Sequence, residues 1–396
     1  MQPHLLTTPA VWMEGSATLQ LSQVAARPGC VRAVGMPDLH PGKQGPIGVA
    51  LAFDDGAHPA LIGGDAGCGA RLVALPRVSA GGLDALERRI RDVSEGPVLD
   101  VDPDELFAAA WTHGPRGLAT LDVPEALQEL AAAEADDGPP SGPVPEGEFG
   151  RALGSVGGGN HFGEISEVED VRLPDLARGA GLVRGGLVVL VHTGSRGLGK
   201  FLADAWATGP LSGKALDAWS GELAGAVRYA RTNRLLVAWR LLRGLGAARS
   251  TKIAGGFDVV HNTVVPTRVD GRDVWLHRKG CAPAELGQLT VVLGSRGARS
   301  WVMEGLGAEA ALCSVAHGAG RKMTRSEAAQ KVKANHTRAS LTRTALGGRV
   351  ICDDPALLYE EHPDAYKPVE PVVDALEVHG AGRRVAALRP LITVKR

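Results

Sequence analysis

The stretch "LIGGDAGCGARLVAL" (residues 61–75) holds Asp65 and Cys68 in a glycine-rich turn between two apolar runs. Its last part, "ARLVAL", has the length and composition of a buried strand. An aspartate three residues before a cysteine indicates either a metal site or a polar turn beside a buried thiol. The two readings carry similar weight for this stretch alone, so the rest of the chain decides between them.

The same alternation of short apolar runs and glycine-rich turns recurs along the chain. It predicts further strands at 30–36, 46–53, 187–195, 258–265 and 273–280. Apolar positions at three- and four-residue spacing predict helices at 83–94 and 124–135. We therefore expect strands and helices to share one chain, with glycine turns at the strand ends.

Two segments have an open interpretation. The breaker-rich stretch "DDGPPSGPVPEG", at about 136–147, is predicted to be a surface loop inside a single domain spanning 1–396, because similar motifs lie on both sides of it. Residues 200–249 look helical and rich in arginine. In this segment Leu235, Trp239 and Leu242 form an apolar stripe. The arginines on the other faces indicate either a solvated surface or a contact surface for an RNA backbone, and they are Arg228, Arg231, Arg234, Arg240 and Arg243.

Composition excludes several classes of protein. The 396 residues include 53 glycines, about twice the usual share, which favours many tight loops. A formal net charge of -1 indicates that any nucleic-acid surface is local. Five dispersed cysteines do not resemble a disulfide framework, and no signal peptide or apolar membrane-length run appears. We expect a soluble cytoplasmic protein with no membrane association.

Histidines beside glycine-rich or amide-bearing turns are the first candidates for chemistry. A single histidine of this kind is more often structural than a ligand, but five of the 12 share the setting: His161, His192, His261, His277 and His317. Imidazole, thiolate and carboxylate together suit Mn²⁺ or Zn²⁺. The set that would supply them is Asp65, Cys68, His161, His192 and His261.

Glycine clusters at 154–160, 192–199, 293–299 and 317–322 combine exposed backbone N–H groups with serine or arginine, which suits phosphate oxygens. None matches a P-loop or a dinucleotide-binding motif, and each alone is as consistent with a tight turn. In "SVAHGAGRKMTR" (314–325), Arg321, Lys322 and Arg325 are expected to surround His317 with positive charge. His317 is then a candidate general acid/base or a nucleophile toward phosphorus.

An ordered series of motifs resembles the RtcB family of RNA-splicing ligases from about residue 31 onward. The series is "MPDLHPGKQGPIG", "DAGCGARL", "GSVGGGNHFGEI", "VHTGSRGLG", Asn233-Arg234, His261-Asn262, "HRKG", "HGAGRKMTR", "AYKPVEPVV" and "LRPLITVK". The resemblance implies a single compact α+β domain with mixed and antiparallel sheets, surrounding helices and glycine-rich loops at the active site.

The resemblance also implies an activity. It is a GTP- and Mn²⁺-dependent ligase joining RNA 3′-phosphate or 2′,3′-cyclic phosphate ends to 5′-hydroxyl ends, in RNA repair or tRNA splicing. His317 would be the nucleophile that forms a histidine-GMP intermediate, and a 3′-diphosphate-guanosine RNA end would follow. Asp65 would bridge two Mn²⁺ ions, completed by Cys68, His161, His192 and His261. The nucleotide would be held by Asn160, Glu164, His261, Asn262, Ser295, His317, Gly318, Gly320 and Lys395.

The chain departs from the family pattern at two positions near the nucleotide. Arg296 in "LGSRG" stands where most members have an apolar residue, and Pro283 in "HRKGCAPA" stands where they have an arginine. These changes bear on guanine preference and RNA contacts. The phrase "HPALIGGDAGCGARL" (58–72) is similar to the subgroup associated with a release-factor homologue, which would be a partner.

Two other functions stay open. A metal-dependent phosphohydrolase acting on RNA ends would keep the metal ligands but would not need His317 or Lys395. A catalytically silent RNA-binding partner of the translation machinery would need none of the ligands. GTP-labelling of the protein and metal analysis separate these functions from a ligase.

Overall fold

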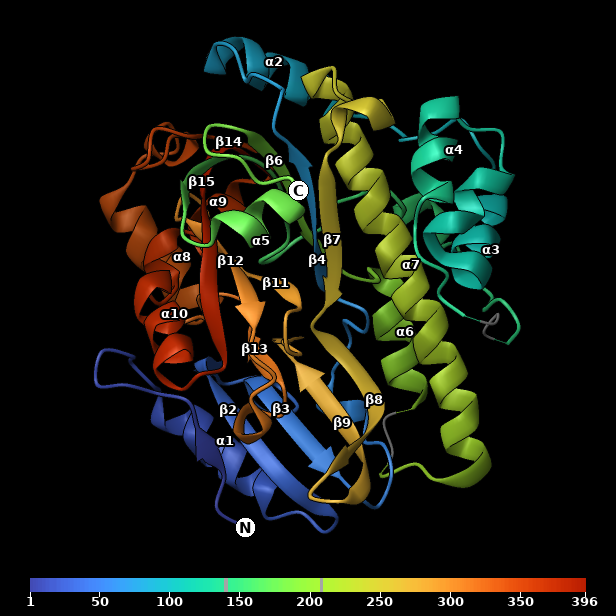
Figure 1. Cartoon of the computed structure of the whole chain (residues 1–396), viewed down its shortest axis with the longest axis vertical. Coiled ribbons are helices and arrows are strands. Elements are labelled where there is room, and N and C mark those ends of the chain that lie inside the picture. Colours follow the sequence, from blue (N-terminus) through green and yellow to red (C-terminus); the bar gives the residue numbers. More distant parts are fainter. Residues whose placement is uncertain (139–141, 207–208) are drawn as a thin grey trace.

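The computed structural model describes residues 1–138, 142–206 and 209–396. Two β-sheets form its frame, one above the other in Figure 1, and helices cover them from outside. Most neighbouring strands are antiparallel. Two pairs are parallel: β1 (His4–Leu5) with β2 (Cys30–His40), and β14 (Arg349–Cys352) with β15 (Gly382–Lys395). The predicted α+β class with mixed and antiparallel sheets is confirmed.

The lower sheet contains the predicted strands near the N-terminus. Alternate side chains of its central strands point to opposite faces. Ala33 and Leu51 pack against helix α1 (Gly15–Ala25), whereas Val34 and Ala50 pack toward α10 (Val369–Val378). In order across the sheet, its strands are β1 (His4–Leu5), β2 (Cys30–His40), β3 (Ile47–Phe53), β9 (Arg272–Lys279) and β8 (Asn262–Val269).

The upper sheet has a long central strand, β15 (Gly382–Lys395), which pairs with β12 and β14 on one side and with β5 on the other. Its interior is apolar on both faces, as expected for strands covered on both sides. In order, its strands are β11 (Leu289–Val292), β12 (Ser300–Gly305), β15, β5 (Phe162–Val171), β6 (Leu187–Thr193), β4 (Gly69–Leu75) and β7 (Gly255–Val260), with β14 (Arg349–Cys352) beside β15. A separate pair joins β10 (Cys281–Pro283) to β13 (Ser314–Ala316).

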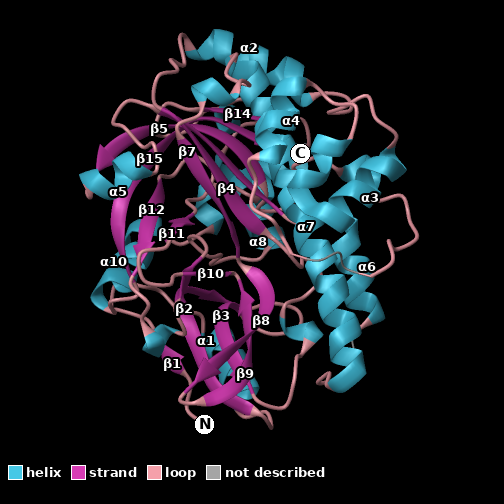
Figure 2. Ribbon diagram, turned by 45° about the vertical axis from the view of Figure 1, so that its right-hand side comes forward, coloured by secondary structure: helices cyan, strands magenta, loops and turns pink. Residues whose placement is uncertain are grey.

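Helix α7 (Gly213–Leu245) runs along one face of the upper sheet, and further helices gather on its outer side (Figure 2). Val237 and Leu241 of α7 pack on Val73 and Val189 of the sheet. The other helices are α2 (Leu83–Ser94), α3 (Pro103–His113), α4 (Glu125–Ala132), α5 (Pro174–Gly179), α6 (Gly197–Ala205), α8 (Arg325–Asn335) and α9 (Pro355–Glu360). No helix in the described part of the chain combines the length and apolar character needed to span a bilayer.

Most predicted elements are present, but the strand expected at 258–265 is divided at His261 between β7 and β8, which belong to different sheets. The helical segment expected at 200–249 is two helices, α6 and α7, and residues 207–208 lie outside the described residues. Helix α3 was not predicted from the sequence, although Asp102 caps its N-terminus. The surface loop expected at about 136–147 has no helix or strand at 136–138 and 142–147, while residues 139–141 lie outside the described residues.

The two sheets are joined directly at one residue. Strand β7 of the upper sheet passes into β8 of the lower sheet with only His261 between them. The backbone N–H of His261 donates to the carbonyl of Cys68 at 2.8 Å, so this crossing lies beside the turn that holds Asp65 and Cys68. The crossing therefore brings ends of strands from both sheets to one place.

Candidate active site

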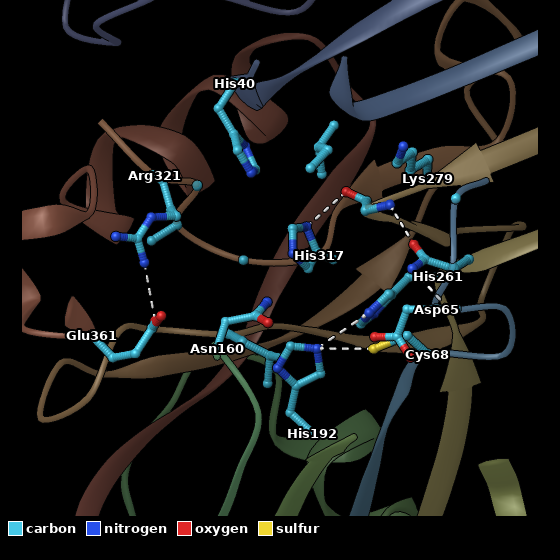
Figure 3. A pocket seen from close by; sticks show the side chains of 18 of the residues that line it. His40, Asp65, Cys68, Asn160, His192, His261, Lys279, His317, Arg321 and Glu361 are labelled. Carbon is cyan, nitrogen blue, oxygen red and sulfur yellow. Dashed lines mark hydrogen bonds and ion pairs between the residues drawn. The ribbon is translucent and has the colours of Figure 1, made fainter. Parts of the chain in front are cut away.

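A cavity of about 480 Å³ lies where the two sheets meet. Its wall contains residues from the β2–β3 connection, the turn before β4, the ends of β6 and β9, and the loops around 293–296 and 317–321. Figure 3 shows His317 in the middle of the labelled side chains, with Asp65 and Cys68 to one side and Arg321 and Glu361 to the other. The cavity thus has two chemically different ends.

At one end, five side chains form two groups that could hold metal ions. Asp65, Cys68 and His161 make one group, and Cys68, His192 and His261 make the other, each with ligand atoms within 4.8 Å of one another. The sulfur of Cys68 lies 3.4 Å from Nε2 of His161 and 3.5 Å from Nε2 of His192. Such separations match ligands around an ion with bonds of about 2.1 to 2.3 Å.

The atom shared by the two groups is the sulfur of Cys68, which differs from the bridging role expected for Asp65. The Asp65 carboxylate lies 3.0 Å from Nε2 of His161 and belongs to one group alone. The Cys68 sulfur lies between His161 and His192, so it is the atom placed to contact two ions.

Local backbone geometry explains why the turn after β6 has a glycine at position 194. A Cβ at Gly194 would lie 2.1 Å from a carboxylate oxygen of Asp65, so only glycine allows the 194–196 turn to approach the carboxylate. The glycine cluster at 192–199 therefore supports a metal ligand instead of forming an isolated phosphate loop.

The metal-ligand end of the cavity is buried, so charged forms of its side chains are unfavourable there unless a cation binds. Burial raises the pKa of the Cys68 thiol well above its usual value, with a further contribution from Asp65. Burial also lowers the pKa values of His192 and His261 well below the usual range, so both imidazoles stay neutral. Neutral imidazoles are metal ligands, and a divalent cation would favour the thiolate. The donor set therefore fits divalent first-row ions.

The imidazole of His317 is held in one orientation. Its Nδ1 lies 2.7 Å from a carboxylate oxygen of Asp38 and 2.7 Å from the carbonyl oxygen of Gly280. Both neighbours accept hydrogen bonds, so Nδ1 carries the proton and Nε2 keeps its lone pair. His317 is thereby prepared to act as a nucleophile through Nε2.

Asp38 is a functional residue that sequence reasoning missed. It is fully buried in β2, and its second carboxylate oxygen has no hydrogen-bond partner among the described residues. Gly320 has a positive φ of 73°, and a Cβ there would lie 2.2 Å from the Asp38 carbonyl oxygen. The motif "MPDLHPG" contained the signal, because a carboxylate inside an apolar strand needs a partner.

The positive charge expected around His317 is arranged differently. Arg321 donates to the carboxylate of the buried Glu361 at 3.1 Å, and Arg325 lies 3.4 Å from the same carboxylate. Lys322 lines a different pocket, beside Trp12 and Lys367. The expectation is met only in part: Arg321 and Arg325 line the cavity with His317 but pair with Glu361, which is distant in sequence, and Lys322 lines another pocket.

Most of the expected nucleotide residues line the cavity: Asn160, His261, Asn262, Ser295, His317, Gly318, Gly320 and Lys395. Glu164 does not. Its carboxylate lies one layer deeper, where it accepts hydrogen bonds from Ser166 and Thr393, and burial raises its pKa to about 7. Lys395 donates to the carbonyl oxygen of His161 at 2.9 Å, and burial lowers its pKa to about 8.

Lys279 and Arg296 are buried cations of the cavity wall that have no carboxylate partner within the described ranges. Burial lowers the pKa of Lys279 to about 8, and its ammonium has neither a hydrogen bond nor an ion pair there. Arg296 is 6% exposed and donates to the carbonyl oxygen of Leu358, but its Nη1 has no partner. Pro283, the other departure, lies in β10 away from the cavity wall.

His277 does not join the other histidines. Its Nε2 accepts a hydrogen bond from the backbone N–H of His58 at 2.8 Å, and its Nδ1 lies 2.9 Å from the carbonyl oxygen of Trp275. The ring packs against Phe53 in the lower sheet. His277 is therefore a structural residue with both nitrogens satisfied.

The arginines of α7 were predicted to form either a solvated surface or a contact surface for an RNA backbone. Neither interpretation fits the central residues of this helix. Arg234 is fully buried and donates to both oxygens of Asp258 at 2.7 and 2.9 Å. Its Nη1 also donates to the carbonyls of Gly67 and Thr193, which directly precede Cys68 and follow His192. Arg231 and Arg71 both lie within ion-pair distance of Glu134 and Asp258. Arg240 donates to backbone carbonyls at 93, 95, 96 and 154. Of the five arginines, Arg243 is the exposed one. These arginines anchor the frame, so the solvated and RNA-binding interpretations are wrong for all but Arg243.

Comparison with known proteins agrees with this geometry. The family described as tRNA-splicing ligase RtcB matches residues 20–215 and 206–396. The RNA-splicing ligase RtcB2 of Escherichia coli is 36% identical over 395 residues, covering 97% of this chain and 93% of the relative. The RNA-splicing ligase RtcB of Mycobacterium tuberculosis is 33% identical (95% and 100% covered), and the tRNA-splicing ligase RtcB of Archaeoglobus fulgidus is 30% identical (97% and 92% covered).

Proposed function

The chain belongs to the RtcB family of RNA-splicing ligases, and from this premise we propose that it uses GTP and Mn²⁺ to join RNA ends. The ends are a 3′-phosphate or 2′,3′-cyclic phosphate and a 5′-hydroxyl. The observation that carries the proposal is the position of His317, in one cavity between a cluster of metal-ligand atoms and a cation-lined end. A nucleophile in that position can reach a phosphate whose negative charge is balanced on either side.

Two Mn²⁺ ions would be held by Asp65, Cys68 and His161 and by Cys68, His192 and His261, with the Cys68 sulfur common to both. Bound ions of this kind balance phosphate charge and stabilise the attacking and leaving oxygens of an in-line displacement. Arg234 supports this arrangement, because it ties Gly67 and Thr193, the neighbours of two ligands, to one guanidinium.

His317 carries the covalent step. Its Nε2 forms a bond to the α-phosphorus of GTP while the bond from that phosphorus to the β-phosphate oxygen breaks, which releases diphosphate. Asp38 and Gly280 hold the Nδ1 proton, and the Asp38 carboxylate balances the positive charge that develops on the ring during attack. Asp38 is thus a positioning residue for the nucleophile.

Two transfers then complete ligation. An oxygen of the RNA 3′-phosphate attacks the phosphorus of the histidine-bound GMP, which frees His317 and gives a 3′-diphosphate-guanosine end. The 5′-hydroxyl attacks the RNA phosphorus of that end and releases GMP. A 2′,3′-cyclic phosphate is first opened by water. Lys279, whose ammonium lacks a partner in the described chain, is available to bind one of these phosphates.

The test is labelling of the protein by GTP. With α-labelled GTP and Mn²⁺ the unaltered protein should gain an acid-labile label, because a phosphorus–nitrogen bond to histidine breaks in acid. His317→Ala should abolish the label, while His336→Ala, at a half-buried histidine outside the cavity wall, should keep it. RNA ends that are processed without GTP, with no joined product, would instead indicate a phosphohydrolase.

Metal counting tests the shared sulfur separately from activity. Equilibrium dialysis should give two Mn²⁺ per chain for the unaltered protein. Asp65→Asn and His261→Ala should each lose one ion, because each residue belongs to one group, and Cys68→Ala should lose both. Loss of a single ion in Cys68→Ala would show that Asp65, not Cys68, forms the bridge.

A further inference from the structure

Arg296 is a buried cation whose charge the protein does not balance. It is 6% exposed and lines the cavity, and one terminal nitrogen, Nη2, donates to the carbonyl oxygen of Leu358 at 3.1 Å. Its other terminal nitrogen, Nη1, has no hydrogen-bond partner, and no carboxylate lies within ion-pair distance of the guanidinium in residues 1–138, 142–206 and 209–396. Two N–H donors are therefore free.

Other buried arginines of the same protein show how unusual this is. Arg71 is equally buried and donates to both oxygens of Glu134, and Arg234 donates to both oxygens of Asp258. Buried charged groups are normally paired because desolvation is costly. An unpaired guanidinium in a cavity wall therefore points to a ligand that brings the missing acceptors.

The position of Arg296 identifies the part of the ligand that it meets. Its guanidinium donates to the carbonyl oxygen of Leu358 in α9 (Pro355–Glu360), the helix that directly precedes Glu361. Glu361 lies across His317 from Asp65 and Cys68 (Figure 3). Arg296 is thus at the end of the cavity opposite the metal-ligand cluster.

That end corresponds to the base of a nucleotide, an inference that rests on the proposed function. If His317 attacks the α-phosphate, the outer phosphates extend toward the metal-ligand cluster. The nucleoside then extends the other way, toward Arg296, Ser295 and Lys395.

We propose that Arg296 is a specificity residue that reads the acceptor edge of guanine. Its free Nη1 and the remaining N–H of Nη2 donate to O6 and N7 of the base, the two acceptors that arginine recognises in guanine. Adenine presents an amino donor in place of O6, so its N6 hydrogens would face a cation. Arg296 thereby favours GTP over ATP.

The experiment compares nucleotide affinities in the His317→Ala background, where binding is measured without chemistry. Arg296→Met should weaken binding of GTP about 10- to 100-fold. Inosine triphosphate, which keeps O6 and N7, should weaken equally, whereas ATP should change less than about twofold. GTP lacking N7, the 7-deaza analogue, should bind the Arg296 protein more weakly than GTP and should lose less on mutation.

Two further variants test whether a loss of affinity reflects only the loss of a positive charge or a loss of protein stability. Arg299→Met removes the same charge three residues away, from a side chain that pairs with Glu169 outside the cavity wall, and should leave all affinities unchanged. Arg296→Gln can keep the hydrogen bond to the Leu358 carbonyl and should lose GTP preference without loss of thermal stability.

The outcomes separate this inference from the proposed function. Equal losses for GTP and ATP would overturn base recognition and indicate contact with a phosphate or sugar. Unchanged GTP affinity in both Arg296 variants would overturn any contact. If the unaltered protein gains a GMP label but Arg296→Met keeps its GTP preference, only this inference fails; if neither labelling nor GTP binding occurs, the proposed function fails as well.

Discussion

The arginines of α7 and the cations of the cavity wall are similarly buried but are held in opposite ways. Arg234 is 0% exposed, and it donates four hydrogen bonds, two to Asp258 and two to backbone carbonyls. Lys279 is 9% exposed, and Arg296 is 6% exposed, yet neither has a carboxylate partner in the described parts of the chain. Charges of the first kind are balanced inside the protein, whereas charges of the second kind are available to bind a ligand.

This difference is a way to distinguish structural from functional charge. The α7 group binds together three strands through Asp258 of β7, Gly67 before β4 and Thr193 of β6. The cavity group has no carboxylate partner among the described residues and makes folding less favourable, because its desolvation is not fully offset. Proteins keep such destabilising residues where function needs them.

The largest expected effect is on the α7 side. Arg234→Met should lower the free energy of unfolding by about 3 to 5 kcal/mol, because it leaves Asp258 buried without its main partner. Urea denaturation followed by circular dichroism measures the change. Arg243→Met, at an exposed arginine on the same helix, should cost less than about 0.5 kcal/mol. Equal effects of the two variants would remove the distinction between the groups.

Asp38 provides a test inside the cavity, because it is a buried carboxylate whose partner is the proposed nucleophile, His317. Asp38→Asn should slow formation of the GMP adduct about 100- to 10,000-fold, because the imidazole loses the anion that fixes its tautomer and stabilises its positive charge. Single-turnover labelling measures the rate. GTP affinity should stay within about twofold of the unaltered value; a change confined to affinity would contradict a positioning role.

Lys279→Met tests the cavity cations, because this substitution should raise the free energy of unfolding. Burial lowers the pKa of Lys279 from 10.5 to about 8, so removing the ammonium should increase the free energy of unfolding by about 1 to 3 kcal/mol. The same variant should bind RNA with a 3′-phosphate more weakly. Lys214→Met, at an exposed lysine outside the cavity wall, is the control. A loss of stability in Lys279→Met would mean that the ammonium has a partner inside the protein.

A pH-dependent effect concerns His277, a histidine whose two ring nitrogens both have partners inside the protein. Burial lowers the pKa of His277 from 6.5 to about 3, so below pH 6.5 the unfolded chain binds a proton that the folded chain excludes. This group should therefore reduce stability by up to about 1.4 kcal/mol per pH unit as pH falls from 6.5 toward 3. His277→Gln should flatten the pH dependence in that range. Parallel curves for the two proteins would contradict the assignment.

Much of the frame could be predicted from local sequence. Apolar runs between glycine turns predicted β2, β3, β4, β6 and β9, because such runs bury both faces of a strand. The structure also brings the five predicted ligands together, and their assignment to Mn²⁺ stays a prediction. Histidines at strand ends were informative because strands from both sheets end at one cavity.

Pairings between distant residues could not be predicted. Arg234 looked like a surface residue because its partner Asp258 is 24 positions away and belongs to another strand. Arg321 appeared free to face His317 because nothing near it in sequence indicated Glu361, and Asp38 had no visible link to a histidine 279 positions away. Spacing likewise gave no means to decide whether Asp65 or Cys68 lies between two ions.

Strand β15 also has a consequence for the order of events during synthesis. Residues 382–395 form a central strand of the upper sheet, between β5 on one side and β12 and β14 on the other, and the same strand carries Lys395. A ribosome makes this segment after all its partners, so the sheet cannot close until residues 382–395 have left the exit tunnel. Arrested chains that stop before Gly382 therefore lack both the middle of the sheet and one wall of the cavity. Closure of the upper sheet and completion of the cavity wall then depend on the same segment.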